Sequence, residues 1–199
     1  MIDSIVPIVE GQAEVDSMPV LMRRLLEEWG IYQLRIEKPV RVKRNQIIKQ
    51  GELERRVTLA MQRPDCRAVV IIIDADDDCP KELAPRLLDR AELIVRNRNT
   101  PVSVVLPKSE LESWFVGSVE SLRGLRGITN AVCSPPDPEA IRDAKGYLTR
   151  AMQRNRRYLE VDDQPAFAER FDLHQAYNNC RSFRKFYTDF RRIVDSLTS

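Results

Sequence analysis

The chain has 199 residues and a formal net charge of +2, with 43% hydrophobic and 31% charged residues, a balance typical of a compact domain. No apolar run approaches the roughly 20 residues needed to span a bilayer, and the first residues do not resemble a signal peptide. We therefore expect a cytoplasmic protein without a membrane segment. The four cysteines form no C-x-x-C pair and His174 is the single histidine, which disfavours disulfide, zinc and histidine-based chemistry.

The amino-terminal two thirds of the chain alternates short apolar runs with amphipathic stretches. The first run, Ser4 to Val9, predicts a strand, and the spacing of apolar residues from Val15 to Trp29 predicts a helix that begins near Glu14. The remaining predicted strands cover residues 33–36, 69–73 and 102–106, with helices at 53–61 and 83–94. This alternation predicts an α/β fold in which helices wrap a mostly parallel sheet.

The carboxyl-terminal third reads as helical after the proline-rich segment 134–138. Apolar residues from Ile141 to Met152 follow one helical stripe, and an aromatic stripe runs from Phe183 to Leu197. We interpret residues 1–133 as an α/β core and residues 134–199 as a helical extension that covers a flank of the sheet within one compact domain.

Four carboxylates crowd the end of the third predicted strand, at Asp74 and from Asp76 to Asp78. Like charges this close resist ionisation unless a counter-charge is present, and Mg²⁺ or Mn²⁺ favours such oxygen ligands. In an extended chain Asp74 and Asp76 would share a face. An isolated D-x-D is explained equally well by a solvated acidic turn. Here, however, Glu10 ends another strand, and parallel strands present their carboxyl ends at one ligand-binding edge.

The sequence therefore predicts a metal site made by Glu10, Asp74 and Asp76, with Asp78 as an auxiliary ligand. Glu14, Glu110 and Glu112 are further auxiliary candidates. Glu110 is equally well explained as an acid that the dipole of a helix amino terminus favours. Glu14 is open to three explanations: a metal ligand, a group that supports the ligands, or a first-turn acid of the opening helix.

Basic residues are unevenly distributed, with seven Lys or Arg between Lys38 and Arg56. Within this run Arg41, Lys43 and Arg44 follow the second predicted strand, so we expect them to hold nucleic-acid phosphates beside the metal edge. A second run covers residues 150–157, which we place on a covering helix away from that edge. The alternative explanation for both runs is that their side chains are ordinary charged surface in contact with solvent.

Two segments carry a resemblance to a known family. The run from Ile8 to Glu14 (IVEGQAE) resembles the VEG-x-x-E opening of TOPRIM domains, the magnesium-binding folds of topoisomerases, bacterial primases and overcoming-lysogenization-defect nucleases, and Asp74-Ala75-Asp76 resembles their D-x-D. Together with residues 110–115 (ELESWF) and 181–186 (RSFRKF), the set is similar to an uncharacterised TOPRIM-like bacterial family that is often encoded beside ATPases of the structural-maintenance-of-chromosomes type. For Glu112, the similarity of Glu-Ser-Trp to the family pattern favours a functional role.

The resemblance implies a nuclease that acts on phosphodiester bonds with Mg²⁺ or Mn²⁺, in defence against phage or plasmids. It also implies a partner ATPase that gates the nuclease, and homo-oligomers are compatible with it. Asp74 and Asp76 would bind the metal, and Glu10 would bind it or act as general base toward water. The competing hypothesis is a non-catalytic metal-binding module that regulates an ATPase.

Overall fold

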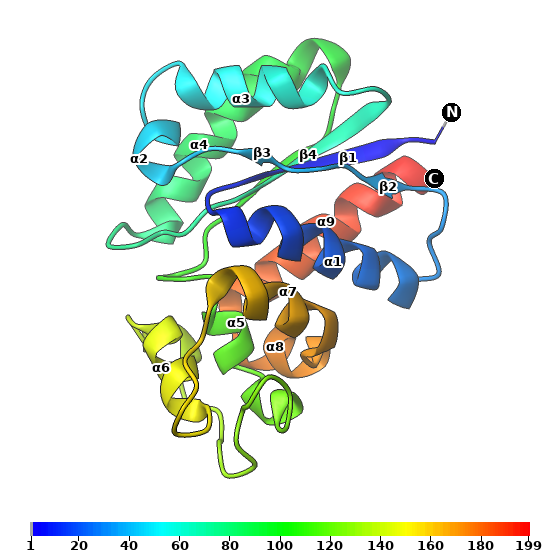
Figure 1. The fold of residues 1–199 in the computed structure, drawn as a ribbon. Helices are drawn as coiled ribbons and strands as arrows, with labels where there is room; N and C mark the ends of the chain where they lie inside the picture. The colour runs from blue at the N-terminus through cyan, green and yellow to red at the C-terminus, as the bar shows by residue number, and fades with distance from the viewer. Residues whose placement is uncertain (1) are drawn as a thin grey trace.

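The computed structural model describes residues 2–199, in which a parallel sheet lies between two layers of helices (Figure 1). The strands are β1 (Ser4–Val9), β2 (Arg35–Ile36), β3 (Val40–Arg41), β4 (Cys66–Ile72) and β5 (Val102–Val105). The α-helices are α1 (Gln12–Glu28), α2 (Arg44–Ile47), α3 (Glu52–Met61), α4 (Pro80–Val95), α5 (Ser113–Val116), α6 (Ala144–Ala151), α7 (Glu160–Arg170), α8 (Leu173–Asn179) and α9 (Arg181–Thr198). The predicted α/β fold with a parallel sheet and carboxyl-terminal helices is confirmed.

β1 lies in the middle of the sheet. It pairs in parallel with β4 on one side, and on the other side with β2 at its start and β3 at its end. β5 extends the sheet beyond β4. The second predicted strand, residues 33–36, corresponds to the shorter β2, and β3 was not predicted. Pro39, which has no N–H for the ladder, lies in the break between β2 and β3.

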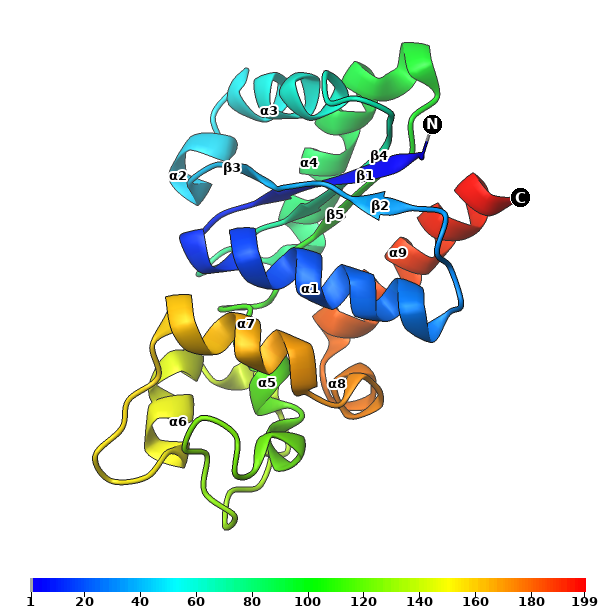
Figure 2. The same cartoon turned by 45° about the vertical axis from the view of Figure 1, so that its right-hand side comes forward.

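The two faces of the sheet support separate layers of the core, which Figure 2 shows from a second angle. Along β1, Val6 and Ile8 point to the layer formed by α3 and α4, whereas Ile5 and Val9 point to the layer that contains α1 and α9. Successive strand residues face opposite sides, so a strand covered on both faces reads as a continuous apolar run. This is why β1 and β4 are recognisable from the sequence.

The carboxyl-terminal helices complete one of these layers. α9 carries the predicted aromatic stripe, and its buried Phe186 and Phe190 share a core with Val70 and Val105 of the sheet. α7 packs along α1, and α5, α6 and α8 gather on the side of α1 that faces away from the sheet (Figure 1). The sequence did not predict α7 or α8, because α8 is short and Pro165 interrupts the α7 pattern. Between residues 2 and 199, none of the helices combines the length and the apolar character that a bilayer crossing requires.

Candidate functional site

Glu10 and Glu14 lie at the junction between β1 and α1, at the carboxyl edge of the sheet. Gly11 is the last residue before the helix, and a Cβ atom there would lie 2.1 Å from Oε2 of Glu14, so only glycine allows this approach. Glu14 is only 9% exposed. Oε2 of Glu10 and Oε2 of Glu14 are both buried without a hydrogen-bond partner in the described chain. Two carboxylate oxygens at one helix amino terminus thus lack a donor.

A cavity of about 400 Å³ opens beside Glu10. Its lining combines the acids Glu10 and Asp76 with the basic side chains of Arg41, Lys43 and Arg44. Burial raises the pKa of Glu10, a backbone hydrogen bond from Arg44 opposes this shift, and the carboxylate of Asp76 adds to it. In the cavity, a carboxylate that readily accepts a proton therefore lies next to a basic wall formed by Arg41, Lys43 and Arg44.

The acidic loop after β4 does not have the predicted extended geometry. β4 ends at Ile72, and Asp76 has a left-handed φ of +50° in a turn closed by a hydrogen bond from the Asp78 N–H to the Ala75 carbonyl (3.0 Å). Asp76 is exposed, whereas Asp74 is partly covered by the helical layer. The expectation that Asp74 and Asp76 share a face of an extended chain is wrong, because the chain turns between them.

Arg44 holds this loop in place. Its Nε donates to the carbonyl of Asp74 (2.9 Å) and its Nη2 to the carbonyl of Ala75 (2.8 Å). The guanidinium also forms ion pairs with Asp78 and, at 3.4 Å, with Asp76. In the structure Arg44 is the counter-charge that a cluster of like charges requires. It also lines the cavity beside Glu10, and its predicted contact with nucleic acid stays a prediction.

Replacing Arg44 with Ala is expected to lower the free energy of unfolding by about 2 kcal/mol, because charge-assisted hydrogen bonds to the loop are lost. Arg44→Lys should recover little of this, since one ammonium cannot reproduce the fork of contacts. Urea unfolding measures the difference. Arg55→Ala, which removes only a surface ion pair with Glu52, is the control, and an equal cost for both variants would contradict the assignment.

Asp74 faces the opposite way from Asp76, toward the carboxyl-terminal helices. Its Oδ1 accepts a hydrogen bond from the Leu111 N–H (2.9 Å). Burial raises the pKa of Asp74 well above its usual value, and the carboxylates of Glu112 and Glu14 raise it further. Asp74 thus links the strand end to a second acidic group.

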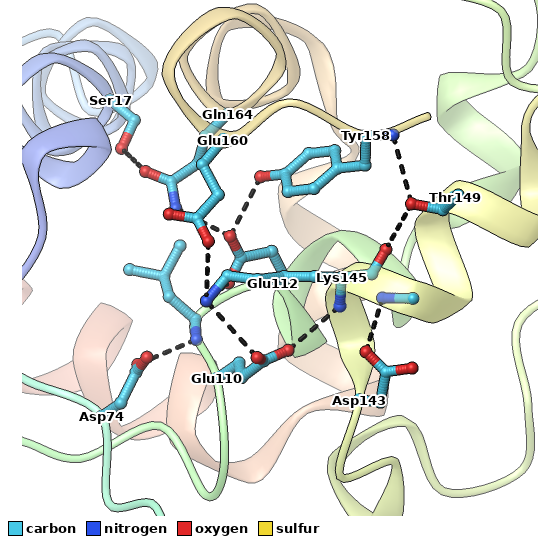
Figure 3. A network of polar contacts seen from close by, with 12 residues as sticks. Ser17, Asp74, Glu110, Glu112, Asp143, Lys145, Thr149, Tyr158, Glu160 and Gln164 are labelled. Carbon is cyan, nitrogen blue, oxygen red and sulfur yellow. Dashed lines mark hydrogen bonds and ion pairs between the residues drawn. The ribbon is translucent and has the colours of Figure 1, made fainter. Parts of the chain in front are cut away.

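Glu112 and Lys145 form the centre of that group (Figure 3). Glu112 is fully buried, and its Oε1 accepts hydrogen bonds from the Tyr158 hydroxyl (3.0 Å) and from Nε2 of Gln164 (3.1 Å). Its Oε2 has no hydrogen-bond donor and lies 3.8 Å from Nζ of Lys145. Burial raises the pKa of Glu112 to about 7.

Lys145 connects the core to the helical extension. Its Nζ lies 3.3 Å from Oε1 of Glu110 and 3.1 Å from Oε1 of Glu160, and its backbone N–H donates to Oε2 of Glu110 (3.0 Å). The neighbouring carboxylates, Glu112 first, raise the pKa of Lys145 despite burial, which lowers it. Glu110 and Glu112 therefore share a lysine, and each has a structural role in the network.

The structure thus separates the predicted acids into an outer group, an inner group and three acids between them. Asp76 and Asp78 lie on the outer side with Arg44. Glu110 and Glu112 lie on the inner side with Lys145. Glu10, Glu14 and Asp74 lie between these groups, as their mutual electrostatic effects indicate.

Within residues 2–199, no three acidic, histidine or cysteine side chains are grouped closely enough to form a metal site by themselves. A magnesium ion does not require such a cage, because it usually keeps several waters and binds one or two carboxylates together with substrate phosphate. The buried, unpartnered oxygens of Glu10 and Glu14 fit a divalent cation bound in that way.

Sequence reasoning missed Lys145, Tyr158, Gln164 and Ser17. The hydroxyl of Ser17 donates to Oε1 of Gln164 (2.6 Å), which orients the amide that holds Glu112. One signal pointed to Lys145: it lies in the first turn of α6, where the helix dipole disfavours a cation, so a compensating acid is expected nearby. The other three are polar residues whose long-range partners leave no local pattern.

The second basic run lies mostly outside the predicted helix. Arg150 ends the exposed side of α6, whereas Arg154, Arg156 and Arg157 belong to the loop between α6 and α7 and are exposed. Arg41 and Lys43, in contrast, lie beside Glu10, and Nε of Arg41 donates to the Glu10 carbonyl (3.2 Å).

Comparisons with known proteins give one family and no function. A family model described as "Domain of unknown function (DUF4276)" matches residues 9–191, which is nearly the whole chain. No curated protein and no solved structure matches the sequence.

Proposed function

The chain belongs to the family described as a domain of unknown function (DUF4276), and from the geometry of its site we propose that it is a divalent-metal-dependent nuclease of TOPRIM-like type. The single observation that carries this proposal is the cavity beside Glu10, where an unpartnered carboxylate oxygen lies opposite Arg41 and Lys43. Phosphodiester cleavage needs this combination, since carboxylates hold the metal and basic groups hold the phosphates.

Each side chain has a distinct role in this proposal. Glu10, Glu14 and Asp74 would hold a Mg²⁺ or Mn²⁺ ion, which would polarise a phosphate oxygen and lower the pKa of its water. Glu10, whose pKa is raised by burial, accepts a proton from the attacking water. Arg41 and Lys43 bind the phosphates on either side of the scissile bond. Lys145 offsets the charge of Glu112, which keeps the inner wall of the site compact.

The resemblance to TOPRIM-like proteins adds a biological setting to the proposal. The nuclease would act in the cytoplasm, in defence against foreign DNA or RNA, under the control of a partner ATPase. The direct test is hydrolysis of labelled single-stranded and duplex nucleic acids by the purified chain with Mg²⁺ or Mn²⁺, set against the same reactions in EDTA.

A second candidate is a non-catalytic metal-binding module that regulates an ATPase. One observation favours it: Asp76 and Asp78, two of the predicted ligands, are already paired with Arg44. Absence of cleavage with every substrate, metal and partner tested would select this candidate.

Metal binding itself is expected to raise the melting temperature. At 100 times the dissociation constant, Mg²⁺ or Mn²⁺ should stabilise the folded protein by about 2.7 kcal/mol. Glu10→Gln should remove most of this effect while leaving the metal-free protein at least as stable, since the amide removes a charge that partial burial penalises and Oε2 of Glu10 has no donor to lose. Differential scanning calorimetry with and without metal measures both. Equal stabilisation of the variant would remove Glu10 from the metal site.

The basic wall is tested by the salt dependence of binding. Neutralising Arg41 and Lys43 removes two phosphate contacts, so the slope of log affinity against log salt should shrink by about 1.8 on duplex DNA and by about 1.4 on single strands. Arg44 is left intact because it holds the acidic loop. The matched control neutralises Arg154 and Arg157, and a larger loss in the control than in the test variant would place nucleic acid on another face.

A further inference from the structure

Lys145 lies inside a group of carboxylates that outnumber it (Figure 3). Its Nζ is 3.1 Å from Oε1 of Glu160, 3.3 Å from Oε1 of Glu110 and 3.8 Å from Oε2 of Glu112. An ordinary ion pair needs one acid for each lysine, and carboxylates this close to one another resist ionisation unless the positive charge between them is sufficient. Several carboxylate oxygens directed at one point are instead typical of a position for a divalent cation.

The oxygen that Glu112 contributes to this group is the least satisfied of them. Glu112 is fully buried, and its Oε1 accepts hydrogen bonds from Tyr158 and Gln164, whereas its Oε2 has no donor in the described chain. At 3.8 Å the ammonium is too far from Oε2 for a hydrogen bond. A buried carboxylate oxygen without a donor is costly. Glu112 therefore directs at the cation position an atom that the lysine satisfies only in part.

The position of Lys145 is not one that its own helix favours. Asp143 caps α6 by accepting a hydrogen bond from the Gly146 N–H (2.7 Å), and Lys145 follows in the first turn, where the helix dipole disfavours a cation. The ammonium is therefore held there by carboxylates, which come from the segment after β5 and from the first residue of α7. The Lys145 side chain is 32% exposed, so an ion from solution can reach the same position when this side chain is shortened.

This cation position adjoins the proposed metal centre. Besides burial, which raises the pKa of Asp74 most, the charge of Glu112 raises it and the charge of Lys145 lowers it, so the ammonium lies within electrostatic reach of the strand end. We propose that Nζ of Lys145 is the second cation of that centre, in the role that a second metal ion has in two-metal sites, so that the chain binds one divalent ion and excludes another. The inference rests on the proposed function for the first ion, whereas the second position is defined by Lys145 and its three glutamates.

A divalent ion fits this position once the lysine side chain is removed. Bonds from Mg²⁺ or Ca²⁺ to oxygen are about 2.0–2.6 Å long, shorter than the distances from Nζ to the carboxylates. The ion would therefore draw one or two carboxylates inward and reach the rest through its waters. The wide spacing around the ammonium also explains why, within residues 2–199, these acids form no metal cage while Lys145 is present.

The test counts bound ions. Isothermal titration calorimetry of the metal-free protein with Mn²⁺ should give one ion for each wild-type chain and two for each Lys145→Ala chain. Lys145→Arg is the matched control and should bind one ion, because the guanidinium keeps a positive charge in the position. Adding Glu110→Gln to Lys145→Ala should weaken binding of the second ion by at least about tenfold, because a ligand charge is removed.

Stability gives a readout that does not depend on the count. Lys145→Ala should be less stable than wild type without metal, and Mn²⁺ should raise its melting temperature by more than that of the wild type. Lys145→Gln keeps most of the aliphatic stem of the lysine, and it should also bind two ions. It carries the test if Lys145→Ala does not fold.

The outcomes separate this inference from the proposed function. One ion in both neutral variants, or two in wild type, would overturn the role of Lys145 and leave the proposed function standing. No ion in wild type but one in Lys145→Ala would remove the metal centre at Glu10 and retain the cation position assigned to Lys145. No ion in any variant would overturn both.

Discussion

Replacing Glu10 with Gln is expected to lower metal-dependent cleavage by about 10³-fold, which corresponds to about 4 kcal/mol of transition-state stabilisation. The amide keeps the size of the side chain, but it removes the charge that holds the metal and the group that accepts a proton from water. Because Arg41 and Lys43 are unchanged, affinity for nucleic acid measured without metal should stay within about twofold. Single-turnover cleavage of a labelled strand measures the first effect and anisotropy the second.

Glu27→Gln is the matched control for this experiment. Glu27 is exposed near the far end of α1, the helix that follows Glu10, so its substitution removes the same charge away from the cavity. Asp74→Asn should resemble Glu10→Gln, because the amide oxygen can still accept the hydrogen bond from Leu111 while the charge is lost. Full activity in both site variants would reject the mechanism. If Glu27→Gln also lost activity, the loss in the site variants could not be assigned to the cavity.

The parts of this fold that could be predicted are those encoded locally. β1 and β4 are buried on both faces, so their apolar runs stand out, and the residues after them must lie at the carboxyl edge of a parallel sheet. This reasoning locates Glu10 and Asp74 without knowledge of their contacts. β3 is two residues long and is stabilised by pairing with β1, so it leaves no pattern of its own.

The arrangement of side chains within the site depends on contacts that no local pattern carries. The direction in which Asp76 points is set by a left-handed backbone at that residue and by an arginine 32 positions earlier in the chain. Glu112 was recognised as a candidate, but its burial depends on Tyr158 and Gln164 from the helical extension. The sequence predicts which acids lie at the carboxyl edge of the sheet. It does not predict which basic residue pairs with each acid.

The inner network is expected to produce a large stability effect when its cation is removed. Replacing Lys145 with Met should lower the free energy of unfolding at pH 8 by about 3 kcal/mol, because Glu112 is then left buried without a compensating charge. Combining it with Glu112→Gln should recover most of the loss, since the uncompensated charge is gone and Gln can still accept hydrogen bonds from Tyr158 and Gln164. A double-mutant cycle in urea gives this coupling energy. Additive losses would mean that Lys145 and Glu112 act independently.

The same carboxyl group gives the metal-free protein a pH dependence of defined sign. The folded-state pKa of Glu112 is raised from 4.5 to about 7, so the folded protein retains a proton that the unfolded chain releases in this window. Stability should therefore fall as the pH rises from 4.5 to 7, by up to about 3 kcal/mol from this group, and level off above pH 7. Asp74 shifts in the same direction, so the informative quantity is the difference between wild type and Glu112→Gln, followed by urea unfolding in EDTA. A constant difference across this range would mean that Glu112 stays ionised in the folded protein, and that Lys145 compensates its charge completely.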